Sequence, residues 1–329
     1  MITYGEHKFS IEVVMAENKI QFQKGISITE FMERYGTEEQ CQKALEKMKW
    51  PHGFICEECG HRSFSYIKSR KLYQCNRCKH QTTVIRHTIF HSTNLPLTTW
   101  FLAMYFMTQC KNGISSMELM KHLGVAYKTA WKIRHKLMQV MVEQDVKKKL
   151  MGLIEVDDAY LGGKKSDSKR GRGSENKQPI LVAVEVSLDY RPQSVKLSPV
   201  KAFSSEEIEK WSKTHLHSSS YVITDGLPCF SAFSNSTKRH LAVKMKPDPE
   251  TGKKPYFNWV NTILGNVKSS ITGTYRSRKA EYTARYLAEF QYRINRRFDL
   301  KTILSKLIHA AVHTPPLPKE LLRLAANCT

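Results

Sequence analysis

The segment LIEVDDAYLGG, residues 153–163, decides the fold, because it is an apolar, strand-like run that leads into two adjacent aspartates. A second run of the same kind, SSYVITDGL at residues 219–227, ends near Asp225. Carboxylates at the ends of buried strands are costly unless something positive holds them, and a divalent metal ion is the usual partner. Asp157 and Asp225 lie 68 positions apart, which leaves room for strands and a helix between them. The two runs therefore predict neighbouring strands of one sheet that carry a metal pair.

The surrounding segments predict an α/β domain. Between residues 151 and 245, short β-branched runs alternate with the helical stretch SSEEIEKWSKTHL, and such alternation is typical of this fold class. Within the first run, the period of two puts Glu155 and Asp157 on one face of the strand and Asp158 on the other. Single aspartates at strand ends are common, so each one alone is weak support for a metal site.

A third segment, WVNTILGNVK at residues 259–268, has the spacing of a helix. Asn261 and Lys268 are seven positions apart, about two helical turns, and so point the same way. Beside the sheet, Asn261 can offer a carbonyl oxygen to a metal and Lys268 can meet a phosphate. An ordinary amphipathic helix explains this segment equally well on its own.

The cysteines predict a structural zinc site. Cys56-x-x-Cys59 is followed, after fifteen intervening residues, by Cys75-x-x-Cys78, which matches zinc-ribbon spacing. Four thiolates complete a tetrahedral site and leave no position for water, so this zinc is structural. Four unrelated cysteines, or a redox pair without a βαβ context, fit less well. The same hairpin contains several basic residues and is therefore predicted to contact DNA. These residues are Arg62, Lys68, Arg70, Lys71, Arg77 and Lys79.

Residues 113–138 have a helix-turn-helix pattern, with a short apolar helix, a turn at Leu123-Gly124-Val125, and a second helix. The second helix is expected to present its polar residues outward, toward a DNA groove and its phosphates. Those residues are Tyr127, Lys128, Lys132, Arg134, His135 and Lys136, of which Lys128, Lys132, Arg134 and Lys136 are the predicted DNA-binding set. A packed helical hairpin is the alternative.

The stretch KKSDSKRGRGSENK, residues 164–177, is basic and rich in glycine and serine. It predicts a surface loop between two strands. Lys169, Arg170 and Arg172 are the candidates in it for a second DNA contact, and a solvated loop with no partner is the alternative.

Charge and composition narrow the class of protein. The chain of 329 residues carries a formal charge of +22 and has a pI near 9.6, which favours a polyanionic partner. The start of the chain lacks the pattern of a secretory signal, and the longest apolar run is far shorter than the roughly 20 residues of a membrane span. A cytoplasmic protein without a membrane partner is expected, and its eight cysteines are then thiols or metal ligands.

Together these segments resemble the bacterial insertion-sequence transposases of the DDE superfamily, in the zinc-ribbon-containing ISXO-type subgroup with Asn in the third catalytic position. The resemblance covers most of the chain and is carried by EEQCQKALEKMKWPHGFICEECG, the second cysteine knuckle, EVDDAYLGG, KRGRG, TDG, WVNTILGNVK, GTY and YLAEFQYRINRR. It implies an α/β, ribonuclease-H-like catalytic domain preceded by a zinc ribbon and a helical, helix-turn-helix-like module.

The resemblance also implies the catalytic residues. Asp157 and Asp225 correspond to the first and second acidic ligands and Asn261 to the third, with Lys268 following it. The implied metal ions are Mg²⁺ or Mn²⁺, and the implied reaction is hydrolysis at the ends of a mobile element and attack of the freed 3′-OH on target DNA. Asn261 carries no charge, so Glu281 or Glu289 of the C-terminal helix is the alternative ligand.

The implied partners are double-stranded DNA, both terminal repeats and target, and a second copy of the chain, because two ends must be synapsed. The expected domains are an N-terminal helical segment at 1–50, the zinc ribbon at 51–92, the helix-turn-helix-like module at 93–148, the catalytic domain at 149–312 and a tail at 313–329. A catalytically inactive DNA-binding protein derived from a transposase is the alternative. A basic structural or RNA-binding protein fits less well, because no aromatic RNA-binding signature is present.

Overall fold

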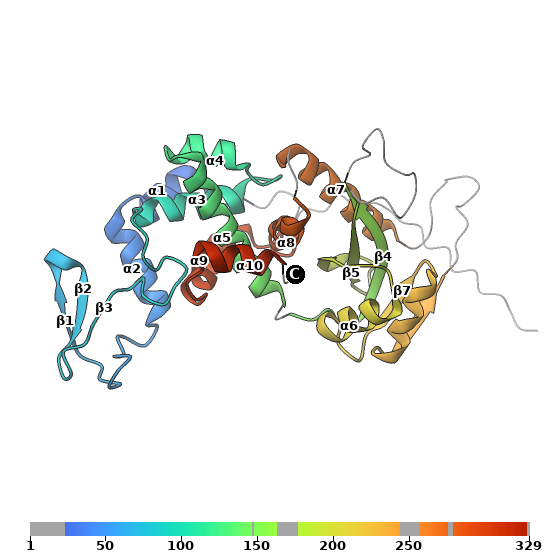
Figure 1. The fold of residues 1–329 in the computed structure, drawn as a ribbon, viewed down its shortest axis with the longest axis horizontal. Helices are drawn as coiled ribbons and strands as arrows, with labels where there is room; N and C mark the ends of the chain where they lie inside the picture. The colour runs from blue at the N-terminus through green and yellow to red at the C-terminus, as the bar shows by residue number, and fades with distance from the viewer. Residues whose placement is uncertain (1–23, 147, 163–176, 244–256, 276–278, 328–329) are drawn as a thin grey trace, which may run out of the picture.

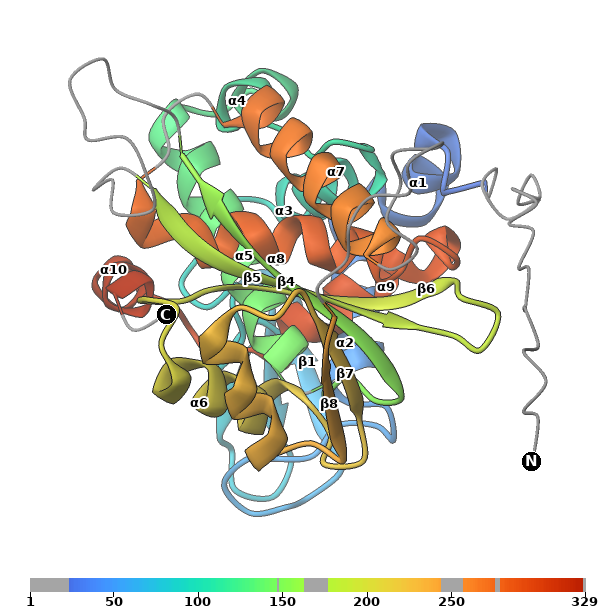
Figure 2. The same cartoon turned by 90° about the vertical axis from the view of Figure 1, so that its right-hand side faces the viewer.

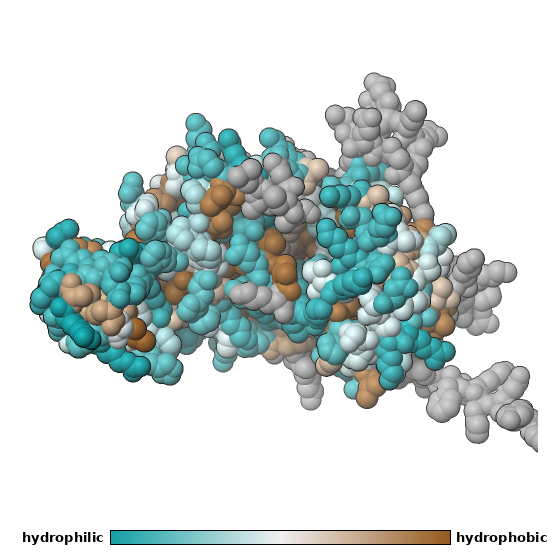
Figure 3. All heavy atoms as spheres, turned by 60° about the horizontal axis from the view of Figure 1, so that its bottom comes forward, coloured by the Kyte–Doolittle hydropathy of each residue, from teal (hydrophilic) through white to brown (hydrophobic). Residues whose placement is uncertain are grey.

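The computed structural model describes residues 24–146, 148–162, 177–243, 257–275 and 279–327. The protein is elongated, with a small three-stranded sheet at one end, a five-stranded sheet at the other and a body of helices between them (Figure 1). None of the described helices is long and apolar enough to cross a bilayer. Figure 3 shows one face of the molecule, on which hydrophilic side chains predominate and apolar ones form separate patches.

The small sheet follows two capped helices, α1 (Ile28–Tyr35) and α2 (Glu38–Lys49). Its antiparallel strands are β1 (Phe64–Ile67), β2 (Leu72–Cys75) and β3 (Gln81–Thr82), with the short helix η2 (Lys68–Arg70) at the β1–β2 turn. Trp50, Phe54 and Tyr73 pack together beneath it, and Gln42 of α2 donates to the Tyr73 hydroxyl at 2.9 Å. Aromatic packing thus fixes the small sheet against α2.

The helical body combines segments from both halves of the chain. It contains α3 (Leu97–Gln109), α4 (Ser116–Leu123) and α5 (Tyr127–Val146), followed much later by η4 (Ala280–Tyr282), α8 (Thr283–Ile294), α9 (Leu300–Val312) and α10 (Lys319–Asn327). The side chains of α3 are buried on most sides, because α2, α4, α5 and α9 all pack against it. Helices from beyond residue 280 therefore share one core with the predicted helix-turn-helix segment.

The large sheet is mixed, which confirms the α/β prediction. Its strands are β4 (Leu153–Leu161), β5 (Gln178–Val186), β6 (Pro192–Pro199), β7 (Tyr221–Thr224) and β8 (Arg239–Ala242), in the order β6-β5-β4-β7-β8. The pairs β4–β5 and β5–β6 are antiparallel, whereas β4–β7 and β7–β8 are parallel. The central position of β4 brings the strand with two aspartates beside the strand that leads to the third.

Helices cover both faces of this sheet (Figure 2). One face packs on α6 (Ser205–His215) and η3 (Pro228–Asn235) through Ile154, Val156 and Val222. The other packs on α7 (Asn258–Thr274) and α8. The edge strand β6 is closed by α8, since Asn295 Oδ1 accepts from the Val195 amide at 2.7 Å and Gln291 Oε1 from the Leu197 amide at 2.6 Å. Those side chains satisfy an edge that would otherwise be open to strand pairing.

Candidate metal centres and DNA-binding surface

Three aspartates converge where β4 and β7 separate. The parallel ladder runs as far as the pair Val156 and Thr224, so Asp157 and Asp225 follow side by side on the two strands. Asp157, Asp158 and Asp225 each contribute a carboxylate oxygen to a group in which all three oxygens lie within 4.8 Å of one another. All three side chains are half-buried. Close, partly buried carboxylates repel one another and suit a hard divalent cation, which takes oxygen ligands.

The backbone around the aspartates orients them. Asp157 Oδ1 accepts from the Asp158 amide at 2.9 Å. Asp225 Oδ1 accepts from the Leu227 amide at 3.2 Å, across Gly226, whose φ of 85° lies in the region that favours glycine. The turn after β7 therefore holds the Asp225 carboxylate back over the strand end.

Asp158 was not predicted to join this group. Strand alternation assigned it to the opposite face from Asp157, and that rule describes where a Cβ points rather than how far a carboxylate reaches. Both residues lie within β4, but the neighbouring strand β7 ends at Thr224, and beyond that point both carboxylates approach Asp225. The signal for it in the sequence was the adjacent pair Asp157-Asp158 itself.

The third predicted ligand lies on α7, which packs against β4 and β5. Asn261 and Lys268 are both exposed, whereas Val260, Ile263 and Val267 are buried. The amphipathic pattern predicted from the sequence is therefore present. The roles of Asn261 and Lys268 in metal and phosphate binding stay predictions.

The alternative ligands Glu281 and Glu289 do not join the aspartate group within the described residues. Glu289 is fully buried and is bound by Arg134 at 2.8 Å, by Arg293 at 3.0 Å and by the Tyr275 hydroxyl. Burial raises the pKa of Glu289, but the charges of Arg134 and Arg293 outweigh it and hold the pKa below its usual value. A carboxylate committed to two guanidinium groups is not available as a spare metal ligand, so we do not assign Glu289 to the metal site.

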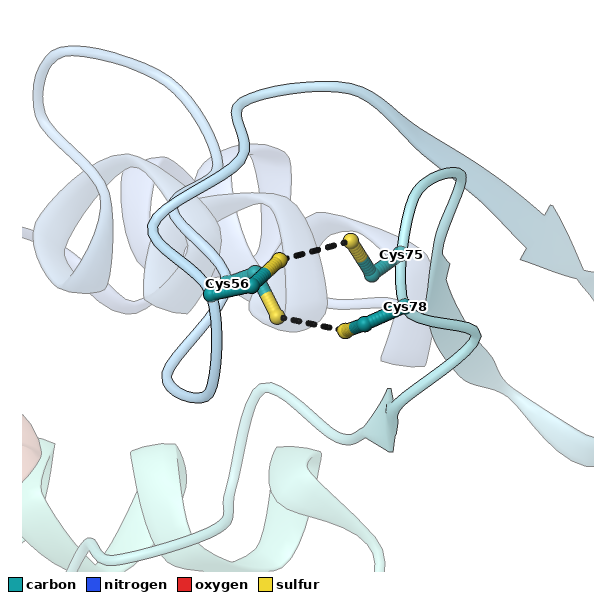
Figure 4. A group of neighbouring side chains, drawn as sticks. Cys56, Cys75 and Cys78 are labelled. Atoms are coloured by element: carbon teal, nitrogen blue, oxygen red, sulfur yellow. Dashed lines mark hydrogen bonds between the residues drawn. The ribbon is translucent and has the colours of Figure 1, made fainter.

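The four cysteines form the second candidate metal centre (Figure 4). The Sγ atoms of Cys56 and Cys78 are 3.5 Å apart, and those of Cys59 and Cys75 are 3.6 Å apart. Around a zinc ion with Zn–S bonds of about 2.3 Å, tetrahedral thiolates lie about 3.8 Å apart. The four thiols are therefore arranged as a Cys₄ zinc site requires, and all four lie within 4.8 Å of one another.

Both cysteine knuckles have the same backbone. The amide of Gly60 donates to Cys56 O and that of Lys79 to Cys75 O, and Gly60 and Lys79 have φ values of 70° and 60°. Burial raises the pKa of Cys75, but hydrogen bonds from the backbone of Cys78 and Arg77 and from neighbouring thiols lower it to about 6. For Cys78, a backbone hydrogen bond from His80 lowers the pKa, but burial and the neighbouring thiols raise it to about 12. The cluster thus favours at least one thiolate, the form that binds zinc.

Cys75→Ser is expected to remove zinc from the ribbon and to weaken DNA binding. Three thiolates and a hydroxyl bind zinc more weakly, and the fold of the small sheet depends on the ion. The checks are zinc content by elemental analysis and DNA affinity by fluorescence anisotropy. Cys229→Ser, at a buried cysteine outside the cluster, is the control. Unchanged zinc content in Cys75→Ser would refute the assignment.

The predicted helix-turn-helix segment forms two helices. Ser115 and Glu118 make a capping box at the start of α4, and Gly124, with a φ of 64°, ends it before α5 begins at Tyr127. Lys128 and Lys132 are exposed on α5, and Lys136 is half-buried with its Nζ 5.9 Å from the centre of the Trp100 ring. Tyr127 is exposed as well, so three of the predicted outward residues are available to a groove.

The prediction that Arg134 and His135 point outward was wrong. Arg134 is 3% exposed and its guanidinium pairs with Glu289 of α8. His135 is also buried, and burial together with the charges of Arg285 and Arg134 lowers its pKa to about 2, so that it stays neutral. The helical spacing of Ala130, Arg134 and Met138, all buried, was the missed signal that this stripe faces the core.

Lys169, Arg170 and Arg172, the other predicted DNA contacts, lie outside the described residues.

Two segments of the chain match family models of transposase domains. Residues 149–295 match the model of the ISXO2-like transposase domain, and residues 36–81 match that of the transposase zinc-ribbon domain. The chain is 25% identical over 211 residues to an uncharacterized protein in transposable element ISH50 of Halobacterium salinarum, a match that covers 59% of this chain and 69% of that protein. These matches bear out the predicted resemblance to insertion-sequence transposases of the DDE superfamily with a zinc ribbon.

Among solved structures, the chain is similar to one in the crystal structure of a pre-cleavage Mos1 transpososome. The similarity covers 63% of this chain and 78% of that chain at 8% identity, with a TM-score of 0.20. A score this low carries no conclusion about the fold.

Proposed function

We propose that this protein cleaves the ends of an insertion sequence by metal-dependent phosphodiester hydrolysis and joins the freed 3′-OH to target DNA. The observation that carries the proposal is the group of three aspartate oxygens, two from the middle of β4 and one from the residue after β7, inside the segment that matches a transposase domain. The mixed sheet with helices on both faces supports the ribonuclease-H-like assignment.

The donor set fits hard divalent cations, and we assign Asp157 and Asp225 as metal ligands with Asn261 as a neutral third. Bound Mg²⁺ or Mn²⁺ would supply an activated oxygen nucleophile and would stabilise the leaving oxygen. Asp158 adds a third carboxylate beside the ligand pair. Lys268, exposed on α7, is proposed to neutralise a phosphate of the bound strand.

The helices α4 and α5 are proposed to bind the terminal repeats as a helix-turn-helix-like module, with Lys128, Lys132 and Lys136 as the contacts. The zinc ribbon carries exposed basic residues at its β1–β2 turn, Lys68, Arg70 and Lys71, which would contact the phosphate backbone. Because two element ends must be held together, we propose a homodimer or a higher oligomer on double-stranded DNA. A chromosomal substrate makes the cytoplasm the proposed location.

The double substitution Lys128→Ala and Lys132→Ala is expected to weaken DNA binding and to reduce its salt dependence. Each phosphate contact contributes about 0.9 to the slope of log K against log salt, so the slope should fall by roughly 2. Anisotropy titrations at several salt concentrations measure it. The matched control is Lys201→Ala with Lys210→Ala, two exposed lysines near and on α6. A slope unchanged in the α5 variant would exclude these lysines as contacts.

The proposed reaction is tested with an oligonucleotide that bears the element's terminal repeat, in Mg²⁺ or Mn²⁺. Cleavage at the 3′ end, followed by transfer to a target duplex, is the expected result. If DNA is bound but never cut, the protein is instead a catalytically inactive DNA-binding derivative of a transposase.

A further inference from the structure

We infer that Glu155 is a positioning residue for the proposed metal site, because it fastens the start of α7, and with it Asn261, to β4 beside Asp157. The inference rests on the proposed function and explains how the chain holds Asn261, the uncharged third ligand, in place. It concerns a residue that touches neither metal nor DNA.

Glu155 is a carboxylate with 0% exposure in the middle of the large sheet. Its Oε1 accepts from the Phe257 amide at 3.1 Å and from the Tyr190 hydroxyl. A buried acid of this kind is destabilising unless its partners matter to the fold or to the site.

The partner on α7 is the unprotected start of a helix. Phe257 is the N-cap residue, has a φ of 69° and makes no side-chain cap of its own. The first amides of a helix have no partner within it and carry partial positive charge. In most helices the side chain of a Ser or Asp at the N-cap accepts a hydrogen bond from these amides. Here Glu155, on strand β4, provides the acceptor instead.

Tyr190 connects Glu155 to the first turn of α7 by a second route. Its hydroxyl binds Glu155, and its carbonyl oxygen accepts from Trp259 Nε1, on the first turn of α7, at 2.6 Å. The backbone of that turn thus binds Glu155 directly, and the Trp259 side chain binds Tyr190, which itself donates to Glu155. Lateral movement of the turn would break both bonds.

This attachment lies close to the proposed metal ligands. Glu155 and Asp157 share a face of β4, about 6.6 Å apart along the strand. Asn261 follows Phe257 by four residues, about 6 Å along the helix axis. The other end of α7 is held separately, since Ser270 and Thr274 donate to Asn112 O at 3.0 and 2.9 Å. Glu155 is therefore expected to fix the position of the N-terminal end of α7, which carries Asn261.

The test is Glu155→Gln in the full chain, with Mn²⁺ alone as the probe. An amide keeps the shape but loses the charge that the helix start and Tyr190 stabilise. Residues that orient metal ligands typically alter metal affinity by about 10–100-fold. Electron paramagnetic resonance titration of Mn²⁺ is expected to show about tenfold weaker binding, and hydrogen exchange is expected to be faster at residues 257–261.

Ser270→Ala is the matched control, because it removes a bond at the far end of the same helix. It should lower the midpoint of thermal unfolding but leave Mn²⁺ affinity as in the wild type. Should Glu155→Gln not fold, Tyr190→Phe removes one donor without changing charge, and about threefold weaker Mn²⁺ binding is expected. Wild-type Mn²⁺ affinity in whichever variant folds would overturn the inference. A wild-type protein that binds no Mn²⁺ would instead overturn the proposed function.

Discussion

Asp157→Ala is expected to abolish cleavage of terminal-repeat DNA while zinc content and DNA binding stay as in the wild type. Asp157 belongs to the aspartate group, next to Asp158 in the chain and beside Asp225, which follows the parallel strand β7. Losing one of the ligands removes several kcal/mol of charge stabilisation in the transition state. A loss of about 4 kcal/mol corresponds to a rate lower by roughly a thousandfold.

The measurement is single-turnover cleavage of a labelled terminal-repeat duplex over a range of Mn²⁺ concentrations. Asp299→Ala makes the same substitution at a partly exposed aspartate paired with Lys306 at 2.6 Å, and this variant should cut as fast as the wild type. Cleavage unchanged in Asp157→Ala would remove that residue from the catalytic assignment. Loss of DNA binding in the same variant would point to a damaged fold rather than to a lost ligand.

Features encoded by local spacing could be predicted from the sequence. The zinc site could be predicted from the spacing of the cysteines alone, because each four-residue knuckle brings its two thiols together. The runs before Asp157 and Asp225 predicted strands, and their apolar residues do face the helices on either side of the sheet. The α/β class followed from the same alternation.

Features that depend on distant partners could not be predicted. Glu289 pairs with a residue 155 positions earlier in the chain, and no pattern in its own helix reveals that partner. Glu155 likewise finds the start of α7 102 positions later. Arg134 was assigned to a DNA surface from the helix-turn-helix pattern, although its helical spacing with Ala130 and Met138 indicated a buried stripe. A charged residue in such a stripe is a sign of a buried partner rather than of a surface.

Glu289→Gln is expected to destabilise the helical body strongly. The carboxylate is 0% exposed and lies between Arg134, 3% exposed, and Arg293, with the Tyr275 hydroxyl as a further donor. An uncharged amide leaves two buried guanidinium groups without a counter-charge. Removing one member of a buried ion pair costs about 3–5 kcal/mol, out of a total that is typically about 5–15 kcal/mol.

The pKa of Glu289 is held low by Arg134 and Arg293, so the ion pairs are intact at neutral pH and their contribution is lost only as the pH falls into the acid range below the usual value for Glu. Urea unfolding at pH 7 followed by circular dichroism measures the loss. Glu281→Gln is the matched control, since its carboxylate is exposed and 3.9 Å from Lys279, and it should change the free energy of unfolding by less than about 1 kcal/mol. Glu289 of α8 binds Arg134 of α5, the helix with the proposed DNA contacts, and Tyr275, which follows α7. If the Glu289→Gln protein is as stable as the wild type, then α5, α7 and α8 are held together by apolar packing and not by the buried charges.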